Sequence, residues 1–452
     1  MTAKKTLNAR EASLLALNKI EEEDAFANLA LAAVFAAHTM DVRDKRLATE
    51  ITYGVTSYRL TLDWLISQIA GRPVTKLDRP VLQALRIGFY QLFYLDRLPA
   101  PAVVHSTVEL IKKSKKRALA PFVNGVLRGF LRKKDALVWP NPELEPLAYL
   151  TIRYAHPEWL VKRWLKRFGR EAAEKLLAAN NQTPPPSARV NTLRTSRDQL
   201  LMRLGEENIQ AIASKVVPDG ILVSGGGHLT AAAAYHEGLF QIQGESAMLT
   251  SHVLNPPTGA KILDGCSAPG GKTTHLAQLM ENAGEVVALD LYEHRLALVQ
   301  ANASRLGVKI IQTASLDVRS ILPQHFGMFD HVLLDVPCSG LGVIRRKPDI
   351  KWRRQEKDIA ALAAVQREIL DAAAQVLKPG GTLVYSTCTN EPEETEDIIK
   401  AFLHRQQNFA AADLTPYLPL SWHEQIGTYG IQLYPHLQEV DGFFIAKLQK
   451  KA

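Results

Sequence analysis

Residues 261–274 read KILDGCSAPGGKTT, and this stretch decides how the second half of the chain folds. A short apolar run leads into Asp264 and then into a glycine-rich turn that opens an amphipathic segment. Small residues in such a turn allow backbone amides to approach a ligand closely. A phosphate loop would need a glycine at the position of Cys266. We therefore expect a ligand site at this turn that is not a phosphate loop.

The strand-to-helix pattern of this stretch repeats towards the C-terminus. Strands are predicted at 261–263, 285–290, 309–312, 331–335 and 381–386, and helices at 273–280, 293–306 and 355–376. Such alternation is typical of a parallel, doubly wound sheet, whose ligand lies beyond the carboxyl ends of the strands. We expect a Rossmann-like α/β domain over residues 256–452.

The sequence upstream of this domain has two further patterns. From Ala9 to Arg132 the apolar residues recur at helical spacing, which predicts an all-α N-terminal domain over residues 1–140. A proline-rich stretch at 180–186 then precedes short apolar runs and one helical segment near 197–207. We expect a small α+β module at 145–255 that joins the helical domain to the Rossmann-like domain.

The overall composition limits the kind of protein. The chain has 452 residues, 46% of them hydrophobic, and a formal net charge of +8, which suits a folded protein with a polyanionic partner. Three cysteines are too few for a disulfide scaffold, so free thiols are expected. No apolar run is long enough to cross a bilayer, and the first residues lack a signal-peptide core. We expect a cytoplasmic protein without a membrane partner, presume a monomer, and predict no metal site.

Acidic residues follow the predicted strands at the edge where a ligand would lie. Asp290 ends the second strand, where a carboxylate typically accepts hydrogen bonds from ribose hydroxyls. Asp317 follows the third strand and either contacts an adenine amino group or only caps a helix. Together with the glycine-rich turn, these residues indicate an adenosine-type cofactor without phosphates.

Two cysteines emerge at neighbouring strand ends. The fourth strand leads into Asp335 and Cys338, and the fifth leads into Cys388. A lone cysteine there is usually a small buried hydrophobe, but two beside an aspartate indicate covalent catalysis. Addition of a thiolate to carbon 6 of cytosine would make carbon 5 nucleophilic enough to accept a methyl group. Asp335 suits an acid near N3 of the base, and Cys338 suits the release step.

Residues 264–273, 335–340 and 386–388 together resemble the motifs of the NOL1/NOP2/Sun family of RNA cytosine-5 methyltransferases. The resemblance implies that Cys388 is the nucleophile and that Cys338 assists product release. It also implies that S-adenosyl-L-methionine is the cofactor, held by Cys266, Ser267, Ala268, Pro269, Gly270, Gly271, Lys272, Asp290, Asp317 and Asp335. The chain departs from the family at Gly244, where an acidic residue is frequent.

The helical first domain resembles the RNA-binding antitermination factor NusB, and this fusion is typical of the family's RsmB (Sun/Fmu) branch, which modifies bacterial 16S ribosomal RNA. The resemblance implies 16S rRNA as partner and no DNA. Two basic stretches are candidate RNA contacts, although a charge run is a merely solvated face about as often. They comprise Lys112, Lys113, Lys115, Lys116, Arg117, Arg345, Arg346 and Lys347. Trp352, beside the second stretch, is predicted to pack rather than to stack on a base.

Three alternatives remain open at the level of sequence. The same chemistry could act on transfer RNA. A non-catalytic RNA-binding assembly or antitermination factor could retain the fold, although it would need neither thiol nor Asp335. A DNA methyltransferase is disfavoured, because those enzymes use the thiol of the Pro-Cys motif.

Overall fold

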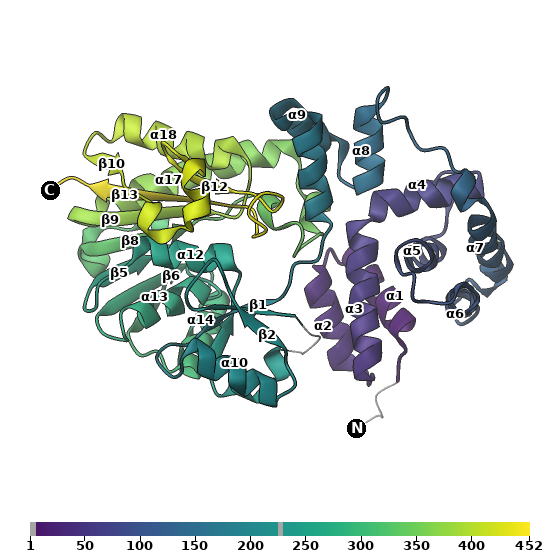
Figure 1. The fold of residues 1–452 in the computed structure, drawn as a ribbon, viewed down its shortest axis with the longest axis horizontal. Coiled ribbons are helices and arrows are strands. Elements are labelled where there is room, and N and C mark those ends of the chain that lie inside the picture. The colour runs from purple at the N-terminus through teal and green to yellow at the C-terminus, as the bar shows by residue number, and fades with distance from the viewer. Residues whose placement is uncertain (1–5, 225–228) are drawn as a thin grey trace. The chain divides into compact units, whose positions relative to one another are not determined.

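The computed structural model describes residues 6–224 and 229–452, and it divides the chain into two compact units (Figure 1). The first unit combines residues 1–182 with residues 344–353. The second unit combines residues 183–343 with residues 354–452. The short segment 344–353 therefore belongs by its contacts to the first unit, although it lies between two strands of the second along the chain.

The first unit is helical, as predicted. Its helices are α1 (Ala9–Glu22), α2 (Ala27–Ala37), α3 (Val42–Ser57), α4 (Arg59–Ala70), α5 (Arg79–Tyr94), α6 (Ala100–Lys112), α7 (Ala120–Lys133), α8 (Pro146–Tyr154), α9 (Glu158–Asn180) and α16 (Ile350–Arg353). Helix α5 is buried on every side from Val81 to Gln91, which is typical of a helix at the centre of a core. It packs against α1, α3, α4, α6 and α7.

Residues at the helix starts explain where these helices begin. The side chain of Asn8 accepts hydrogen bonds from the backbone amides of Arg10 and Glu11, and the Glu11 side chain accepts from the Asn8 amide in return. This capping box satisfies amides that the helix itself leaves without a partner. Helices α5, α6 and α7 each have a proline in their first turn, where its missing amide costs nothing.

Segment 344–353 is held in the helical unit by specific contacts. The indole Nε1 of Trp352 donates a hydrogen bond to the carbonyl of Thr56 at 2.7 Å. The guanidinium of Arg59 lies 4.4 Å from the centre of the Trp352 ring. The carboxylate of Asp349 accepts from the amide that begins α2, at 3.2 Å. The prediction that Trp352 packs is confirmed.

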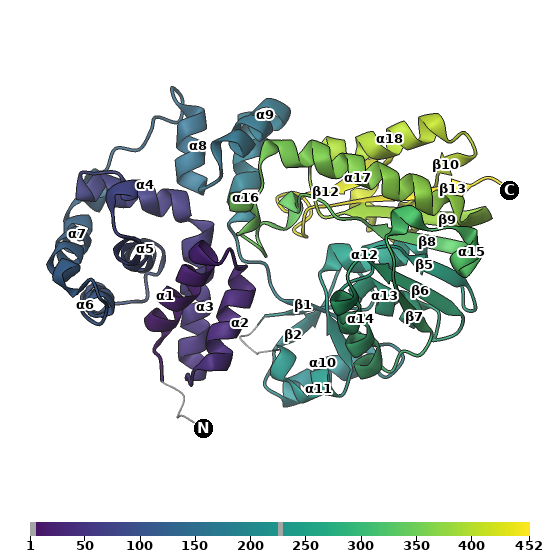
Figure 2. The same cartoon turned by 180° about the vertical axis from the view of Figure 1, so that it is seen from behind.

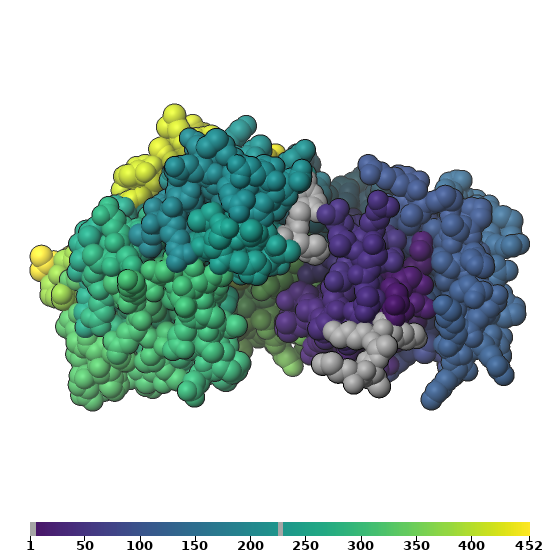
Figure 3. Space-filling model, turned by 90° about the horizontal axis from the view of Figure 1, so that it is seen from below, coloured from purple at the N-terminus to yellow at the C-terminus, as the bar shows by residue number. Residues whose placement is uncertain are grey.

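The second unit begins with a small α+β module, but its first element is β1 at residue 187, whereas α8 and α9, inside the predicted bounds 145–255, belong to the helical unit. The module contains β1 (Ser187–Val190), α10 (Arg197–Glu206), β2 (Ala211–Ala213), β3 (Gly220–Val223), α11 (Ala233–His236) and β4 (Phe240–Ile242). The strands form an antiparallel sheet in the order β2-β3-β1-β4. The apolar residues of this sheet and of α10 form one buried cluster. Figure 3 shows the module in teal at the surface of the second unit.

The remainder of the second unit is one large sheet with helices. Its strands are β5 (Lys261–Asp264), β6 (Glu285–Asp290), β7 (Ile311–Ser315), β8 (Phe329–Asp335), β9 (Leu377–Thr387), β10 (Phe409–Ala411), β11 (Ile426–Gly427), β12 (Gly430–Leu433) and β13 (Phe443–Lys450). The order is β11-β12-β13-β9-β8-β5-β6-β7, and β10 pairs with β13. Strands β9, β8, β5, β6 and β7 run parallel, whereas β13 runs antiparallel to β9. The predicted Rossmann-like fold is confirmed.

Helices cover both faces of this sheet (Figures 1 and 2). They are α12 (Glu245–Leu254), α13 (Gly271–Leu279), α14 (Glu293–Leu306), α15 (Pro323–Phe326), α17 (Glu356–Gln375) and α18 (Glu396–Arg405). Leu333 packs with residues of α12 and α13, whereas its neighbour Leu334 packs with residues of α17 and α18. Successive strand residues point to opposite faces, so both faces are apolar.

One predicted strand is displaced along the chain. The strand expected at 309–312 lies at 311–315. The amide of Lys309 donates to the side chain of Asn282 at 2.8 Å, which keeps this residue in the preceding loop. The displacement does not alter the order of elements.

No helix among the described residues is both long and apolar enough to span a membrane. The longest of them, α9, has 23 residues but carries charged side chains along its length. A spanning helix needs about 20 predominantly apolar residues.

Candidate active site

Two thiols face one another where strands β8 and β9 end. Asp335 pairs in register with Ser386, so the loops that follow these residues run side by side. The sulfur atoms of Cys338 and Cys388 are 3.3 Å apart. A disulfide bond would require about 2.05 Å, so both cysteines are free thiols.

The surroundings of Cys338 favour its protonated form. The hydrogen bond with Cys388 and burial together raise the pKa of the Cys338 thiol well above its ordinary value. Cys338 therefore keeps its proton at neutral pH, and either sulfur of the pair can donate the hydrogen bond that joins them.

A buried carboxylate joins the two cysteine loops. Oε1 of Glu394 accepts a hydrogen bond from the amide of Ser339 at 2.8 Å, and Oε2 accepts from the hydroxyl of Thr389 at 3.2 Å. Gln366 donates to the same carboxylate and to the carbonyl of Pro337, both at 3.0 Å. Ser339 and Thr389 directly follow Cys338 and Cys388, so Glu394 fixes the spacing of the thiols.

Glu394 was not predicted from the sequence. It lies in an acidic stretch after the second cysteine motif, where exposed carboxylates are the usual expectation. Its side chain is instead fully buried, and burial raises its pKa. Glu394 follows Cys388 by six residues. This short separation along the chain is the feature of the sequence that indicates that the carboxylate could lie near the thiol.

The cofactor turn is linked to the cysteines by an ion pair. The Nζ of Lys272 lies 2.6 Å from Oδ2 of Asp335. The hydroxyl of Ser386 donates to the other oxygen of Asp335 at 3.0 Å. The Asp335 side chain remains 31% exposed, so a substrate can reach it. Residues predicted from three separate motifs therefore meet in one place.

The glycine-rich turn leads directly into α13. The amide of Ser267 donates to the carbonyl of Leu289 at 2.8 Å, which holds the turn against strand β6. Gly270 has φ +97°, and a Cβ atom there would lie 2.9 Å from the Cα of Val299. Only glycine suits this position, because the backbone conformation is left-handed and a side chain has no room. The turn thus presents backbone groups at the start of a helix.

Most of the chain matches models of known protein families. Residues 251–449 match the family model described as 16S rRNA methyltransferase RsmB/F. Residues 7–132 match the NusB family, and residues 156–230 match the ferredoxin-like domain of RsmF/B-like methyltransferases. A ribosomal RNA small subunit methyltransferase B from Klebsiella pneumoniae subsp. pneumoniae is 39% identical over 451 residues, which cover 99% of both chains.

The chain belongs to the RsmB/F family of methyltransferases. The resemblance to Sun-family enzymes with a NusB-like domain is therefore confirmed. Among solved structures, the protein titled PH0851 aligns over 99% of this chain and 100% of its own, with TM-score 0.81 and 28% identity. NSun6 from Pyrococcus horikoshii, solved with SFG, aligns over 66% of this chain and 98% of its own, with TM-score 0.58 and 29% identity.

In this RsmB/F-family chain, Asp290 and Asp317 follow neighbouring strands. Asp290 is buried at the end of β6 and accepts from the amide of Tyr292 at 3.1 Å. Asp317 follows β7, accepts from the amide of Arg319 and pairs with its guanidinium at 2.7 Å. The carboxylate of Asp317 therefore caps the short helix Val318–Ser320, which is one of the two roles that the sequence left open for it.

Arg189 supports the cofactor turn from the neighbouring module. Its buried guanidinium donates to the carbonyl of Gly271 at 2.6 Å and to the hydroxyl of Thr274 at 3.0 Å. Its Nε also donates to Gln278 at 3.2 Å. The first two turns of α13 are therefore attached to strand β1.

Three potential metal ligands lie close together, and one of them belongs to α13. Asp219, His252 and His275 have ligand atoms within 4.8 Å of one another. The Nε2 of His252 lies 2.7 Å and that of His275 lies 2.9 Å from the Asp219 carboxylate. The two rings therefore lie on either side of one carboxylate.

The position of Gly244, where the family often has an acid, is close to another carboxylate. An oxygen of Asp441 lies 3.0 Å from the place that a Cβ of Gly244 would occupy. Asp441 is buried. An acidic side chain therefore stands beside this position, although it comes from the loop before β13.

The candidate RNA contacts differ in their surroundings. Lys112, Lys113 and Lys116 form ion pairs of 2.7 to 2.9 Å with Glu109, Glu11 and Asp78. Lys115 and Arg117 are exposed, and the described part of the chain gives them no ion pair. Arg345 and Arg346 are half-buried in segment 344–353, whereas Lys347 is exposed.

A buried carboxyl group on strand β5 gives the first prediction. Burial raises the pKa of Asp264 to about 7, against 3.8 in an unfolded chain. The folded chain binds this proton more tightly, so its contribution to stability falls as pH rises from about 4 to about 7. Each pKa unit corresponds to about 1.4 kcal/mol. Between about pH 5 and pH 8, the wild type should lose about 3 kcal/mol relative to Asp264→Asn.

Urea denaturation of both proteins at the two pH values measures this difference. Asparagine can still accept the hydrogen bond that the Thr273 hydroxyl donates to Asp264 at 2.7 Å. A stability difference that stays constant with pH would show that Asp264 is ionised throughout this range.

Proposed function

We propose that this RsmB/F-family chain transfers a methyl group from S-adenosyl-L-methionine to carbon 5 of a cytosine in 16S rRNA, at cytosine 967. The observation that carries the proposal is the pair of thiols 3.3 Å apart, beside the ion pair of Asp335 and Lys272. The name of the Klebsiella relative supports the small-subunit rRNA as substrate. NSun6, which has a similar fold, was solved with SFG, and this supports a ligand-binding role for that fold in the present chain.

The thiols have complementary roles in the proposed reaction. Cys388 loses its proton to solvent, the resulting thiolate attacks carbon 6 of the cytosine, and the electron pair of the C5–C6 double bond becomes available at carbon 5. The S–H of Cys338 lies next to the attacking sulfur and stabilises it when it leaves again. After methylation, the carbon 5 proton is lost to a base, the double bond reforms and the S–C6 bond breaks.

Asp335 and Lys272 contact the pyrimidine ring in this proposal. Negative charge develops towards N3 and O2 when sulfur adds to carbon 6. The ammonium of Lys272, fixed by Asp335, places positive charge and a proton donor at this edge of the base. A preorganised ion pair of this kind stabilises charge that appears only during the reaction.

The glycine-rich turn and its neighbours would hold the cofactor, which supplies an electrophilic methyl group when bound. Its residues from Cys266 to Lys272 lie beyond the carboxyl end of β5, and Asp290 and Asp317 follow β6 and β7. Buried Asp290 would accept hydrogen bonds from the ribose hydroxyls. The turn has the small residues and backbone amides that a close-fitting ligand requires.

We assign separate tasks to the three expected domains. Residues 1–140 would bind RNA, residues 145–255 would connect, and residues 256–452 would carry out catalysis. The target base must leave its stack to reach the thiols, so we expect a single-stranded or flipped nucleotide as substrate. Lys115, Arg117 and Lys347 are exposed candidate phosphate contacts for which the described residues provide no ion pair.

The test is a methylation assay with three unmodified substrates. The full chain is incubated with S-adenosyl-L-methionine and 16S rRNA, transfer RNA or DNA, and the modified base is mapped by mass spectrometry. We expect 5-methylcytosine in 16S rRNA alone. Methylation of transfer RNA or DNA instead would overturn the substrate, and no methylation of any of them would favour a binding factor.

A further inference from the structure

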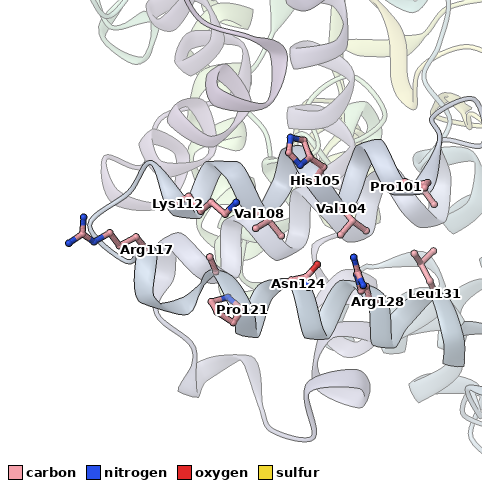
Figure 4. A pocket seen from close by; sticks show the side chains of 12 residues that line it. Pro101, Val104, His105, Val108, Lys112, Arg117, Pro121, Asn124, Arg128 and Leu131 are labelled. Carbon is pink, nitrogen blue, oxygen red and sulfur yellow. The ribbon is translucent and has the colours of Figure 1, made fainter.

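Helices α6 and α7 enclose a groove of about 800 Å³ on the helical unit (Figure 4). The side chains of Val104 and Val108 on α6 face α7, whose Leu131 closes the apolar surface. Ala120 and two prolines, Pro101 and Pro121, complete the apolar part. An apolar hollow of this size can accept a flat aromatic group about as large as a nucleobase.

A polar side chain stands in the middle of this groove. Asn124 lies in the second turn of α7 and projects towards α6. Asparagine is a poor residue for a helix interior, because its side chain competes for backbone hydrogen bonds. Within the described residues, Asn124 makes no hydrogen bond to protein. Its amide can therefore both donate to and accept from a ligand.

The charge around the groove has one sign. Arg117 and Arg128 line it, are exposed, and have no ion pair in the portion of the chain that the structure describes. Lys112 also lines it but is paired with Glu109 at 2.7 Å. The described lining contains no aspartate or glutamate. The groove thus combines an apolar surface with two arginines available for an anion.

We propose that this groove binds a single-stranded segment of the RNA substrate other than the methylated cytosine. One unstacked base rests on Val104 and Val108, Asn124 hydrogen-bonds its edge, and Arg117 and Arg128 contact flanking phosphates. Base edges are readily available only in unpaired RNA, because the major groove of A-form duplex is too narrow. The inference rests on the proposed RNA substrate.

The first experiment measures binding of labelled, unmodified 16S rRNA to the full chain without cofactor, over a range of salt concentrations. The test variant is Arg117→Glu/Arg128→Glu. The control is Arg43→Glu/Lys162→Glu, which makes the same change in net charge at exposed residues of α3 and α9. We expect the test variant to raise Kd at least roughly tenfold beyond the control and to lower the salt slope by about two.

A second variant separates base recognition from charge. Asn124→Ala favours the helix, so it should fold, yet it removes the proposed contact to the base. We expect its Kd to rise roughly tenfold with an unchanged salt slope. Circular dichroism of each variant verifies that α7 is intact.

The outcomes distinguish this inference from the proposed function. If the arginine variant binds no worse than its control, or if Asn124→Ala binds as wild type does, the RNA site is refuted, and an acidic segment of a protein partner becomes the occupant to test. If both variants weaken binding but wild type methylates nothing, the groove stands and the proposed function fails. Methylation kinetics provide an independent readout, since the variants should raise KM for rRNA and leave kcat unchanged.

Discussion

Replacing Cys388 with alanine will abolish methyl transfer to 16S rRNA, by at least about 10⁴-fold. Carbon 5 of cytosine cannot attack a methyl donor until a nucleophile has added to carbon 6. Cys338 is still present in this variant, but in the proposed reaction its thiol serves the release step and does not add to carbon 6. Incorporation of radiolabelled methyl groups into rRNA measures the loss.

The loss in Cys388→Ala must be separated from misfolding. Cys388 is only partly buried, and its sulfur partner is another side chain rather than the backbone. We therefore expect an unchanged thermal midpoint within about 2 °C and unchanged affinity for S-adenosyl-L-methionine by calorimetry. Turnover near that of the wild type in a folded variant would contradict the assignment of the nucleophile.

The parallel sheet could be predicted because its strands carry a local signal. Each strand is a continuous apolar run, since both faces are covered by helices, and each ends in a polar or glycine-rich motif. The carboxyl ends of parallel strands meet at one edge of the sheet, so Cys338 and Cys388 could be placed together without coordinates. The 3.3 Å separation and the link between Lys272 and Asp335 required the structure.

The buried supports of the site could not be predicted. Glu394 and Arg189 are charged residues, and charged residues are almost always exposed unless they are paired. Their burial depends on partners distant in sequence, such as Ser339 for Glu394 and Gly271 for Arg189. A single sequence contains no signal for such pairs.

Segment 344–353 has a placement that the order of residues along the chain does not predict. Its position in the sequence suggests the Rossmann-like unit. Its contacts instead belong to the helical unit, where Lys351 is fully buried and donates to Asn181 at 3.1 Å. Arg354, the next residue, donates to the carbonyl of Ser339 at 2.9 Å in the second unit. The segment thus comes soon after Cys338 in the sequence but packs with the helical unit.

Replacing Cys338 with alanine should have the opposite consequence from the loss of Cys388, because the first bond still forms. Cys388 can add to carbon 6 and methylation can follow, but the departing sulfur loses its hydrogen bond from Cys338. We expect turnover to fall by about 10² to 10⁴-fold, the usual cost of removing a proton donor or acceptor from a reaction step. The covalent protein–RNA intermediate should then accumulate and appear on a denaturing gel as a species of reduced mobility.

The double variant Cys338→Ala/Cys388→Ala identifies the sulfur that forms this intermediate. If Cys388 is the nucleophile, the slow species vanishes in the double variant and is absent from Cys388→Ala alone. If Cys338 were the nucleophile, as in DNA cytosine-5 methyltransferases, Cys338→Ala would give no adduct and Cys388→Ala would retain one. Because the two sulfurs are 3.3 Å apart, geometry alone permits either to reach the base. The gel therefore shows directly which of the two thiols attacks.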